Sequence, residues 1–286
     1  MNDYLISILL GVVEGLTEFL PVSSTAHLRL CKEPLGLRLE DPYWKMYDVV
    51  IQFGAVLAVV VYFRSRIAGF VRTFPRGTDG TRNVFTHPLS MVFIAAVVTV
   101  IPAYFLNETI GENLENYWVI GGALVIGGVV MWVVDRVFTK PTVDRLEQVS
   151  YFQAILIGAA QILAAAFPGT SRSMATIAAG QVARLSRPAA LEFSFFLSIP
   201  IMLGATVLTL YKTIKGEGFG DADVLVMDAH RWGVLAVGFV VSFFVAWAVI
   251  AWFMAWVKRR GFTPFAIYRI VLGLIVLAVA WSRHGA

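Results

Sequence analysis

Six long apolar segments constrain this chain more than any other feature of its sequence. They cover residues 45–63, 88–106, 117–135, 191–211, 232–257 and 264–282. A helix of ~20 apolar residues is long enough to cross the hydrocarbon core of a bilayer. A soluble all-α protein would need polar helix faces, which these segments lack. The composition of the whole chain agrees, since 58% of its residues are hydrophobic and only 15% are charged. The sequence therefore predicts an all-α polytopic membrane protein with six transmembrane helices.

Two further segments, residues 4–30 and 151–183, are apolar but interrupted. Each breaks at a proline beside small and hydroxyl residues, so that neither half is long enough to cross a bilayer alone. Broken backbone at membrane depth is tolerated only where it is buried in protein or lines a wet cavity. We therefore predict two re-entrant helix–loop–helix hairpins, each of which enters and leaves the membrane on the same side.

The two interrupted segments align with each other. In both of them nine residues separate a glycine from a proline, which are Gly11 and Pro21 in the first segment and Gly158 and Pro168 in the second. Each interrupted segment is followed by three of the six spans, which indicates a duplication. Because three crossings is an odd number, the second copy is inverted relative to the first.

This duplication sets the expected domain organisation. We predict a single membrane domain over residues 1–286, with a first repeat at 1–138 and a second repeat at 150–286. Inverted repeats with broken helices build a central site where the breaks meet. The two interrupted segments are therefore where functional residues are expected.

Lysine and arginine are distributed unevenly between the loops. The loops 64–87, 136–150, 184–190 and 258–263 carry thirteen of them, whereas the termini and the loops 28–45, 107–116 and 212–231 carry eight. Basic loops favour the cytoplasmic side, so both termini are predicted to lie outside. Basic loops that face an anionic leaflet also account for the formal net charge of +4, so we predict no nucleic-acid partner.

Two carboxylates lie inside the first interrupted segment. Glu14 and Glu18 are four residues apart, so they project from one face of a helix, one turn from each other. Ionisable groups inside a membrane are expensive and normally functional. Two like charges at this spacing repel unless a cation, an arginine or a shared proton compensates them. The pair therefore predicts a metal site or a proton-handling site.

Hydroxyl groups and an imidazole follow these carboxylates across the break. The run at residues 23–27 reads SSTAH. A histidine beside serines and carboxylates fits a base that activates a hydroxyl, with a carboxylate orienting the ring. We predict Ser24 as a nucleophile, His27 as its base, and Ser23 and Thr25 as substrate-binding residues. Direct attack by water, activated by His27 or a glutamate, is an alternative that the sequence leaves open.

The second interrupted segment contains an arginine within a run of hydroxyl residues. Arg172 lies in the sequence PGTSRS at residues 168–173. Hydroxyls and backbone N–H groups at a helix amino terminus form a cradle for anions, and an arginine can grip phosphate oxygens with two parallel hydrogen bonds. We predict Arg172 as a catalytic residue. The neighbouring hydroxyl residues are predicted to bind substrate, and they are Thr170, Ser171, Ser173 and Thr176.

Three other polar residues lie in the predicted spans. Asp48 and Gln52 are four residues apart near the start of the first span, where they are candidates to face the site. Arg269 has no motif around it and is expected to pair with a backbone or acidic partner. Paired glycines at 121–122 and 127–128 predict close helix packing.

The two polar runs resemble the two signatures of a known family. Residues 13–28 (VEGLTEFLPVSSTAHL) and 168–177 (PGTSRSMATI) are similar to those of bacterial undecaprenyl pyrophosphate phosphatase, the bacitracin-resistance family. Residues 47–54 (YDVVIQFG) and 192–200 (EFSFFLSIP) resemble its flanking segments. Ala26 and Met174 depart from the pattern, because the family usually has glycine at both positions.

The resemblance implies hydrolysis of undecaprenyl pyrophosphate to the monophosphate lipid carrier of cell-wall synthesis, in the bacterial inner membrane. It also implies a requirement for Mg²⁺ or Ca²⁺. The family's site maps onto Glu14 and Glu18 as metal ligands, with Glu18, Ser24, His27 and Arg172 in catalytic roles. The implied partners are a polyprenyl pyrophosphate lipid and the surrounding membrane lipids. A homodimer is one candidate for the oligomeric state.

Two other function classes fit parts of the sequence. A lipid-phosphate translocase or secondary transporter would share an inverted repeat with polar groups near the midplane. A phosphatase of the vanadate-sensitive acid-phosphatase kind carries a Pro-Ser-Gly-His element, which the Ser-Thr-Ala-His run at residues 24–27 resembles. That kind of phosphatase also needs a His-x-x-x-Asp element, and none follows Ser171 and Arg172.

Overall fold

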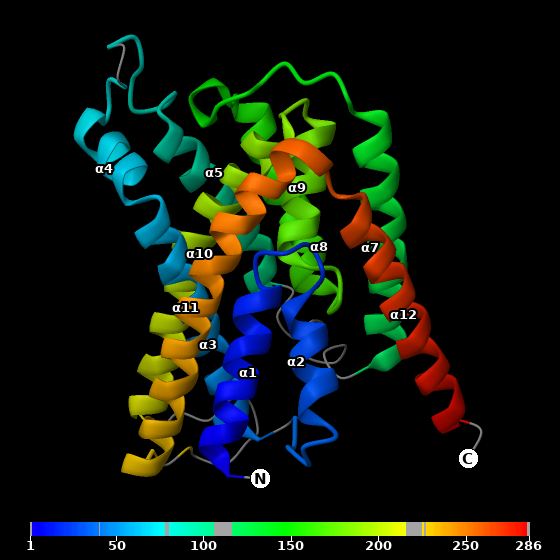
Figure 1. Ribbon diagram of the computed structural model, residues 1–286. Coiled ribbons are helices and arrows are strands. Elements are labelled where there is room, and N and C mark those ends of the chain that lie inside the picture. Colours follow the sequence, from blue (N-terminus) through cyan, green and yellow to red (C-terminus); the bar gives the residue numbers. More distant parts are fainter. Residues whose placement is uncertain are drawn as a thin grey trace. The chain divides into compact units, whose positions relative to one another are not determined.

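The computed structural model describes residues 2–39, 41–77, 80–105, 116–215, 225 and 227–284. Across these residues the protein is α-helical, with one short 3-10 helix and no β-strand. Figure 1 shows the helices, coloured from blue to red along the chain. The predicted all-α fold is therefore confirmed for the part of the chain that the structure describes.

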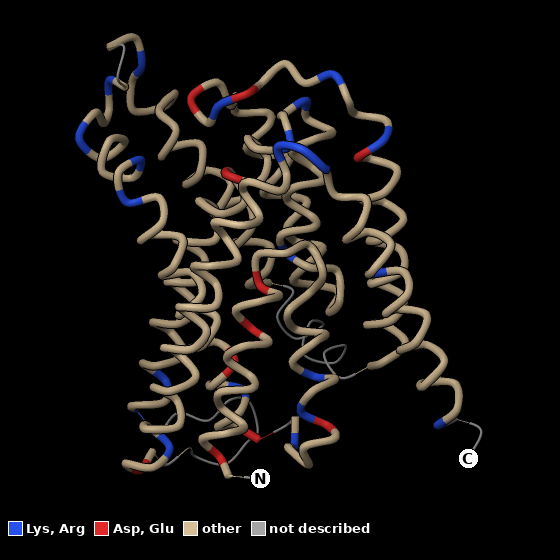
Figure 2. Tube along the Cα trace, viewed as in Figure 1, with Lys and Arg blue, Asp and Glu red and all other residues tan. Residues whose placement is uncertain are grey.

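Six of the helices are long and apolar enough to cross a membrane, as predicted. Figure 2 shows that Lys, Arg, Asp and Glu gather mainly at helix ends and in connections, while most of the length of these helices is uncharged. The two longest, α10 and α11, extend past the predicted apolar cores into charged ends. The six helices are α3 (Pro42–Tyr62), α5 (Pro88–Phe105), α7 (Tyr117–Val137), α10 (Arg187–Lys215), α11 (Ala229–Arg260) and α12 (Thr263–His284).

Both interrupted segments form two short helices around a break. The first comprises α1 (Asp3–Thr17) and α2 (Ser24–Lys32), and the second comprises α8 (Tyr151–Ala166) and α9 (Arg172–Val182). Each break contains the predicted proline, which has no N–H group to continue a helical ladder. The helix–loop–helix pattern is therefore confirmed, while re-entry into a bilayer and the inverted repeat stay predictions.

A serine in an unusual backbone conformation precedes the second helix of each segment. Ser23 has φ 74° and Ser171 has φ 71°, both in the left-handed region that side chains other than glycine rarely adopt. Ser171 also caps α9, since its Oγ accepts a hydrogen bond from the Met174 N–H at 3.3 Å. Ser23 and Ser171 therefore occupy equivalent positions, each directly before its helix. This pairing differs by one residue from the pairing obtained when the two prolines are aligned. The difference arises because the second loop has one more residue between its proline and its helix.

One helix lies where the sequence predicted only a loop. Helix α4 (Arg64–Thr73) occupies the start of the basic connection 64–87. Its Phe70 ring is buried and packs edge-on against Phe196, with ring centroids 5.8 Å apart. Arg66, also on α4, forms ion pairs with Glu192 and Glu147. At 10 residues α4 is too short to cross a bilayer, so apolar packing on one side and ion pairs account for it.

Two of the connections that carry fewer lysines and arginines lie largely outside the described residues. The acidic loop 107–116 is described only at residue 116, and the loop 212–231 only at 212–215, 225 and 227–231. The predicted orientation, with both termini outside, therefore stays a prediction.

The helices form two compact units. The first comprises Met1–Phe19, Ser24–Tyr62 and Ser198–Ala251, and the second comprises Leu20–Ser23, Phe63–Leu197 and Trp252–Ala286. Each unit draws residues from both halves of the chain. Helices α10 and α11 contribute to both units. The predicted single domain and the repeat boundaries at 1–138 and 150–286 stay predictions.

The first unit is built around α1, α3 and the first part of α11. Leu10, Met46 and Ile51 are fully buried in its core. Polar side chains also hold these helices together: the Ser7 hydroxyl donates to the Val234 carbonyl at 2.6 Å, and the Tyr47 hydroxyl donates to the Ser7 carbonyl at 3.0 Å. Hydrogen bonds of this kind connect helices where apolar burial alone gives little driving force.

The second unit contains a close pair of helices, α7 and α12, which run side by side in Figure 1. Gly121 permits this approach, because a Cβ atom there would lie 2.7 Å from Leu277 Cγ and 3.1 Å from the Gly273 carbonyl oxygen. Its neighbour Gly122 faces open space. The prediction of close packing at this glycine pair is thus confirmed for Gly121.

The two neighbouring glycines allow a matched test of this packing. Gly121→Val should destabilise the protein by ~1–3 kcal/mol, because the new side chain overpacks the contact with α12. Gly122→Val changes helix propensity equally, but a Cβ atom at Gly122 has no other atom within 4 Å, so its unfolding midpoint in detergent should stay close to the wild-type value. Equal midpoints for the two variants would contradict the contact.

Candidate active site

The first polar cluster lies at the end of α1, in the first unit. Glu18 follows the last residue of α1 but keeps helical dihedrals, and its N–H donates to the Glu14 carbonyl at 2.9 Å. The two carboxylates therefore lie on one face, one turn apart, as predicted. Only 1% of Glu14 and 5% of Glu18 are exposed. Burial of two carboxylates is costly unless cations, protons or hydrogen bonds compensate it.

Glu18 accepts hydrogen bonds from two residues of other helices. The Ser24 hydroxyl donates to Glu18 Oε2 at 2.5 Å, and the Gln52 amide donates to the same oxygen at 3.0 Å. Ser24 begins α2 and Gln52 lies on α3, so the three groups converge from three helices. A short bond from a hydroxyl to a carboxylate prepares the hydroxyl to lose its proton.

The other residues of the SSTAH run take different positions. His27 lies one turn after Ser24 on α2 and is partly buried, so the two share a helix face. Ser23 is buried at the break, whereas Thr25 is exposed. Ala26 is completely buried. The hydroxyl of Ser24 donates to Glu18, and the predicted roles of Ser24 as nucleophile and His27 as base stay predictions.

The second polar cluster belongs to the second unit and includes the first break itself. The Ser173 hydroxyl on α9 donates to the Leu20 carbonyl at 3.0 Å. The hydroxyl oxygens of Ser171 and Ser173 are 3.0 Å apart. Residues Leu20–Ser23 thus pack with the start of α9, although their chain neighbours Phe19 and Ser24 belong to the first unit. The peptide bond between Ser23 and Ser24 joins the two clusters covalently.

Arg269 of α12 holds both breaks through their backbone. Its guanidinium donates to the Pro21 carbonyl at 3.2 Å, the Gly169 carbonyl at 3.0 Å and the Ala123 carbonyl at 3.1 Å. The side chain is fully buried. Gly127 makes room for it, because a Cβ there would lie 2.4 Å from Arg269 Nη2. One cation therefore ties the first break, the second break and α7 together.

Arg172 is the first residue of α9, directly after the Ser171 cap, and is partly buried. Thr170 is partly buried in the break, where its N–H donates to the Phe167 carbonyl at 3.1 Å. Thr176 is fully buried one turn into α9, with its hydroxyl 2.9 Å from the Arg172 carbonyl and 2.7 Å from Ser194 Oγ. Arg172 and the caps around it thus lie at a helix amino terminus, as predicted, while Thr176 anchors the first turn of that helix.

Sequence reasoning identified some of these contacts and missed others. Arg269 pairs with backbone carbonyls, one of the two kinds of partner expected for it. Gln52 reaches Glu18, whereas Asp48 forms an ion pair with Lys32 at 2.6 Å. Ser194 lies in the segment 192–200 that resembles the family, but nothing in its local sequence indicated a contact with Thr176, because a lone serine in an apolar span is usually a packing residue. Only the fold shows which residue of another helix a polar side chain meets.

The donor set of the first cluster fits a hard divalent cation. Among the described residues, no three His, Cys, Asp or Glu side chains are placed to hold a metal ion together. Mg²⁺, however, is commonly bound by one or two carboxylates, with water and substrate phosphate as its other ligands. The buried pair Glu14 and Glu18 offers these two carboxylates one turn apart.

The fold and the two clusters define a multi-pass helical membrane protein that buries a serine–carboxylate pair and presents an arginine at a helix amino terminus. The chain belongs to the family described as bacitracin resistance protein BacA, whose model matches residues 7–275.

Named relatives cover the chain almost completely. An undecaprenyl-diphosphatase of Koribacter versatilis is 56% identical over 286 residues, which is 99% of this chain and 100% of the relative. Undecaprenyl-diphosphatase 2 of Paramagnetospirillum magneticum is 41% identical, covering 97% of this chain and 99% of the relative. An undecaprenyl-diphosphatase of Lacticaseibacillus paracasei is 37% identical, covering 98% and 99%. The family suggested by the two signatures is therefore confirmed.

The hydrogen bonds from Arg269 to the two breaks and α7 form a clamp, and they predict that the stability of the protein depends on the guanidinium group. Arg269→Lys keeps the charge but replaces a planar fork of donors by one ammonium group, which leaves at least one buried carbonyl unsatisfied. We expect a loss of about 1–3 kcal/mol in the free energy of unfolding, measured by tryptophan fluorescence during thermal unfolding in detergent. Arg283→Lys makes the same chemical change at the exposed end of α12 and should have little effect. Similar midpoints for both variants would refute the clamp.

Proposed function

We propose that this protein is an integral membrane undecaprenyl-diphosphatase, which hydrolyses undecaprenyl pyrophosphate to undecaprenyl phosphate and inorganic phosphate. This reaction recycles the lipid carrier of cell-wall synthesis. The observation that carries the proposal is the Ser24 hydroxyl bonded to buried Glu18 at 2.5 Å. Family membership and the names of the relatives support it. A pure translocase, the alternative considered from the sequence, would need no activated hydroxyl.

In the proposed first step, Ser24 Oγ attacks the terminal phosphorus while its proton passes to Glu18 Oε2. The bond from that phosphorus to the bridging oxygen breaks, and undecaprenyl phosphate leaves. Gln52 holds Glu18 in position through its amide. This assigns the proton of Ser24 to Glu18, because the hydroxyl bond runs to that carboxylate.

The second proposed step releases the phosphate from Ser24. Water attacks the phosphoserine and loses a proton to His27, which lies on the same face of α2. The bond from phosphorus to Ser24 Oγ breaks, inorganic phosphate leaves, and Ser24 regains its proton from Glu18, while His27 releases the proton of the water to solvent. Direct attack of water on the substrate, without phosphoserine, is the alternative route.

Arg172 and the surrounding hydroxyls are proposed to neutralise the pyrophosphate. A guanidinium at a helix amino terminus combines a bidentate donor with the positive end of the helix dipole. Ser171 and Ser173 shape this terminus, and Thr176 and Ser194 brace its first turn. Ser23, Thr25 and Thr170 complete the set of proposed substrate-binding residues.

A divalent cation, Mg²⁺ or Ca²⁺, is the proposed cofactor, with Glu14 and Glu18 as its protein ligands. When bound, such a cation stabilises charge on phosphate oxygens. The two carboxylates bring it to the same cluster as the Ser24 hydroxyl.

The proposed setting is the bacterial inner membrane. The helix–loop–helix segments α1–α2 and α8–α9 would be re-entrant hairpins of an inverted repeat, because each helix is too short to span a bilayer. Both termini would lie outside, with the basic connections in the cytoplasm. The prenyl tail would stay among membrane lipids while the headgroup reaches the polar residues. Homodimer formation stays a prediction, which the mass of the protein in detergent can test.

The reaction and its nucleophile can be tested together. Purified protein in detergent should release phosphate from undecaprenyl pyrophosphate, and substrate labelled with ³²P at the terminal phosphate should leave label on Ser24 after acid quenching. Ser24→Ala should trap no label and lose at least tenfold in rate, or ~1.4 kcal/mol. Absence of phosphate release would favour a translocase. Ser24→Ala turning over at more than about a tenth of the wild-type rate would make water the nucleophile.

The proposed cation site predicts that substituting either glutamate weakens Mg²⁺ binding, while only the substitution of Glu18 also removes the proton acceptor of Ser24. Glu14→Gln should weaken Mg²⁺ binding at least tenfold, or ~1.4 kcal/mol, measured by calorimetry on the purified protein, because one of two ligands loses its charge. Glu18→Gln should weaken binding similarly and also lose the proton acceptor of Ser24. Asp144→Asn removes one exposed carboxylate elsewhere and serves as the control. Superimposable titrations of all three variants with the wild type would exclude the pair as metal ligands.

A further inference from the structure

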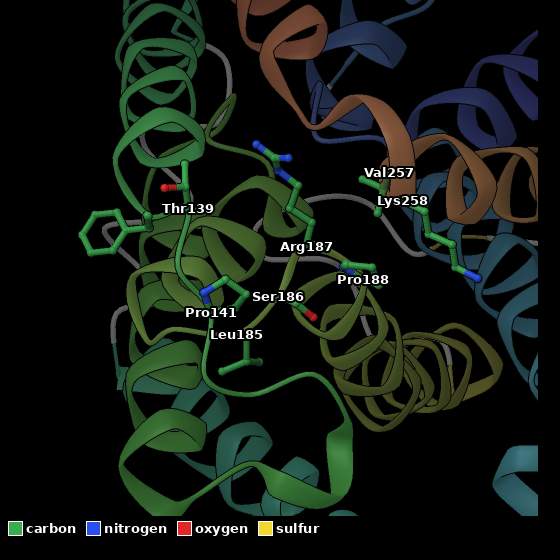
Figure 3. A pocket seen from close by; sticks show the side chains of 9 residues that line it. Thr139, Pro141, Leu185, Ser186, Arg187, Pro188, Val257 and Lys258 are labelled. Atoms are coloured by element: carbon green, nitrogen blue, oxygen red, sulfur yellow. The ribbon is translucent and has the colours of Figure 1, made fainter.

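A second polar site lies in the second unit, at the ends of three membrane-spanning helices. It is a pocket of about 210 Å³. In Figure 3, Thr139 and Pro141 border one side, Val257 and Lys258 border the other, and Ser186 and Pro188 lie between them. Thr139 and Pro141 follow the end of α7. Ser186 and Pro188 flank the first residue of α10, and Val257 and Lys258 lie in the last turn of α11. The pocket therefore lies where three long apolar helices end.

The pocket is separate from the proposed active-site residues. Helix α9 begins at Arg172 and ends at Val182, and the pocket residue Leu185 follows three residues later. Eleven helical residues at ~1.5 Å per residue put roughly 16 Å between the two ends of α9. A ligand in the pocket would thus occupy the opposite end of α9 from Arg172.

Aromatic and apolar side chains place the pocket at headgroup depth. The Arg136 guanidinium lies 5.1 Å from the Trp132 ring near the end of α7, and the Arg260 guanidinium lies 5.2 Å from the Trp256 ring at the end of α11. Tryptophan and arginine pairs of this kind are typical of the membrane–water interface. Val137, the residue before the pocket residue Phe138, is 64% exposed at the end of α7, as expected for a surface that meets acyl chains.

The residues around the pocket are strongly basic. Segments 135–141, 184–188 and 257–260 contain seven lysines and arginines but one acidic residue, Asp135. That carboxylate is buried and is bonded by Arg187 at 2.7 Å and by the Phe262 N–H at 3.0 Å. The Lys258 ammonium group and the Ser186 hydroxyl, by contrast, have no hydrogen bond or ion pair to other residues in the described part of the chain. In Figure 3 the Lys258 side chain extends away from Ser186, but it is exposed and has rotatable bonds along its whole length, so it can turn toward a ligand. The pocket thus offers donors and positive charge to an anion.

We propose that this pocket binds the headgroup phosphate of an anionic phospholipid, with Lys258 and Ser186 as its donors and the lipid's acyl chain against Val137. The amino terminus of α10 adds a favourable dipole. A basic pocket at the membrane surface with an apolar wall beside it suits a lipid better than a free anion, because both parts of the ligand then find a partner.

Native mass spectrometry of the full chain can test this proposal with phosphatidylglycerol and phosphatidylcholine as probes. The wild type should bind one phosphatidylglycerol preferentially. Lys258→Gln combined with Ser186→Ala should weaken that binding at least fivefold. Arg259→Gln and Arg72→Gln each remove an exposed charge outside the pocket and should change it less than twofold. Equal losses in all variants would mean diffuse attraction and would overturn the proposal, as would no loss in the double variant.

The acyl contact separates a lipid from a free anion. Val137→Gln should weaken phosphatidylglycerol binding at least twofold, and excess inorganic phosphate should not displace the lipid from the wild type. Displacement by inorganic phosphate together with an unaffected Val137→Gln variant would identify a free-anion site and overturn the proposal. Because Lys258 and Val137 are exposed, unchanged unfolding midpoints can verify that these variants fold.

Discussion

The hydrogen bonds of Arg269 make it possible to break two helices inside an apolar protein. A helix break leaves carbonyl groups without their usual partners, and no water in a bilayer core can replace them. Arg269 supplies donors to the carbonyls of Pro21 and Gly169, one from each break, and to Ala123 of α7. A buried guanidinium is itself costly unless hydrogen bonds compensate it, and here both Nη groups of Arg269 donate to carbonyls. The arginine and the broken helices therefore stabilise each other, and Gly127 leaves the space that the side chain needs.

The breaks held in this way position the chemical groups. Ser23 and Ser171 adopt left-handed backbone conformations that turn the chain sharply into α2 and α9. The first turn brings Ser24 to Glu18, and the second puts Arg172 at the amino terminus of α9. Strained backbone of this kind persists only where the surrounding structure over-determines it. Here the surrounding contacts are the Arg269 clamp and the Ser173 hydroxyl on the Leu20 carbonyl.

Glu18 is the group on which the proposed chemistry depends most. Its Oε2 accepts hydrogen bonds from both Ser24 and Gln52, so its orientation is set by α2 and α3 together. Glu14, one turn earlier, adds a second buried carboxylate. Glu18 would thus serve both as a ligand of the proposed cation and as the acceptor of the Ser24 proton. The lipid pocket at the far end of α9 uses different chemistry, with lysine and hydroxyl donors at the membrane surface.

The sequence by itself determined the fold class, the six spans, the two broken segments and the family, because apolar length and the prolines are local properties of the chain. The Glu14 and Glu18 spacing likewise follows from helix geometry alone. Only the tertiary structure decided that Gln52 meets Glu18 while Asp48 meets Lys32, that Ser24 donates to a carboxylate, and that Arg269 spans both breaks. It also decided that α4 is a helix, through the burial of Phe70. These contacts join residues far apart in the chain, and which faces of two helices meet depends on packing that no local pattern encodes.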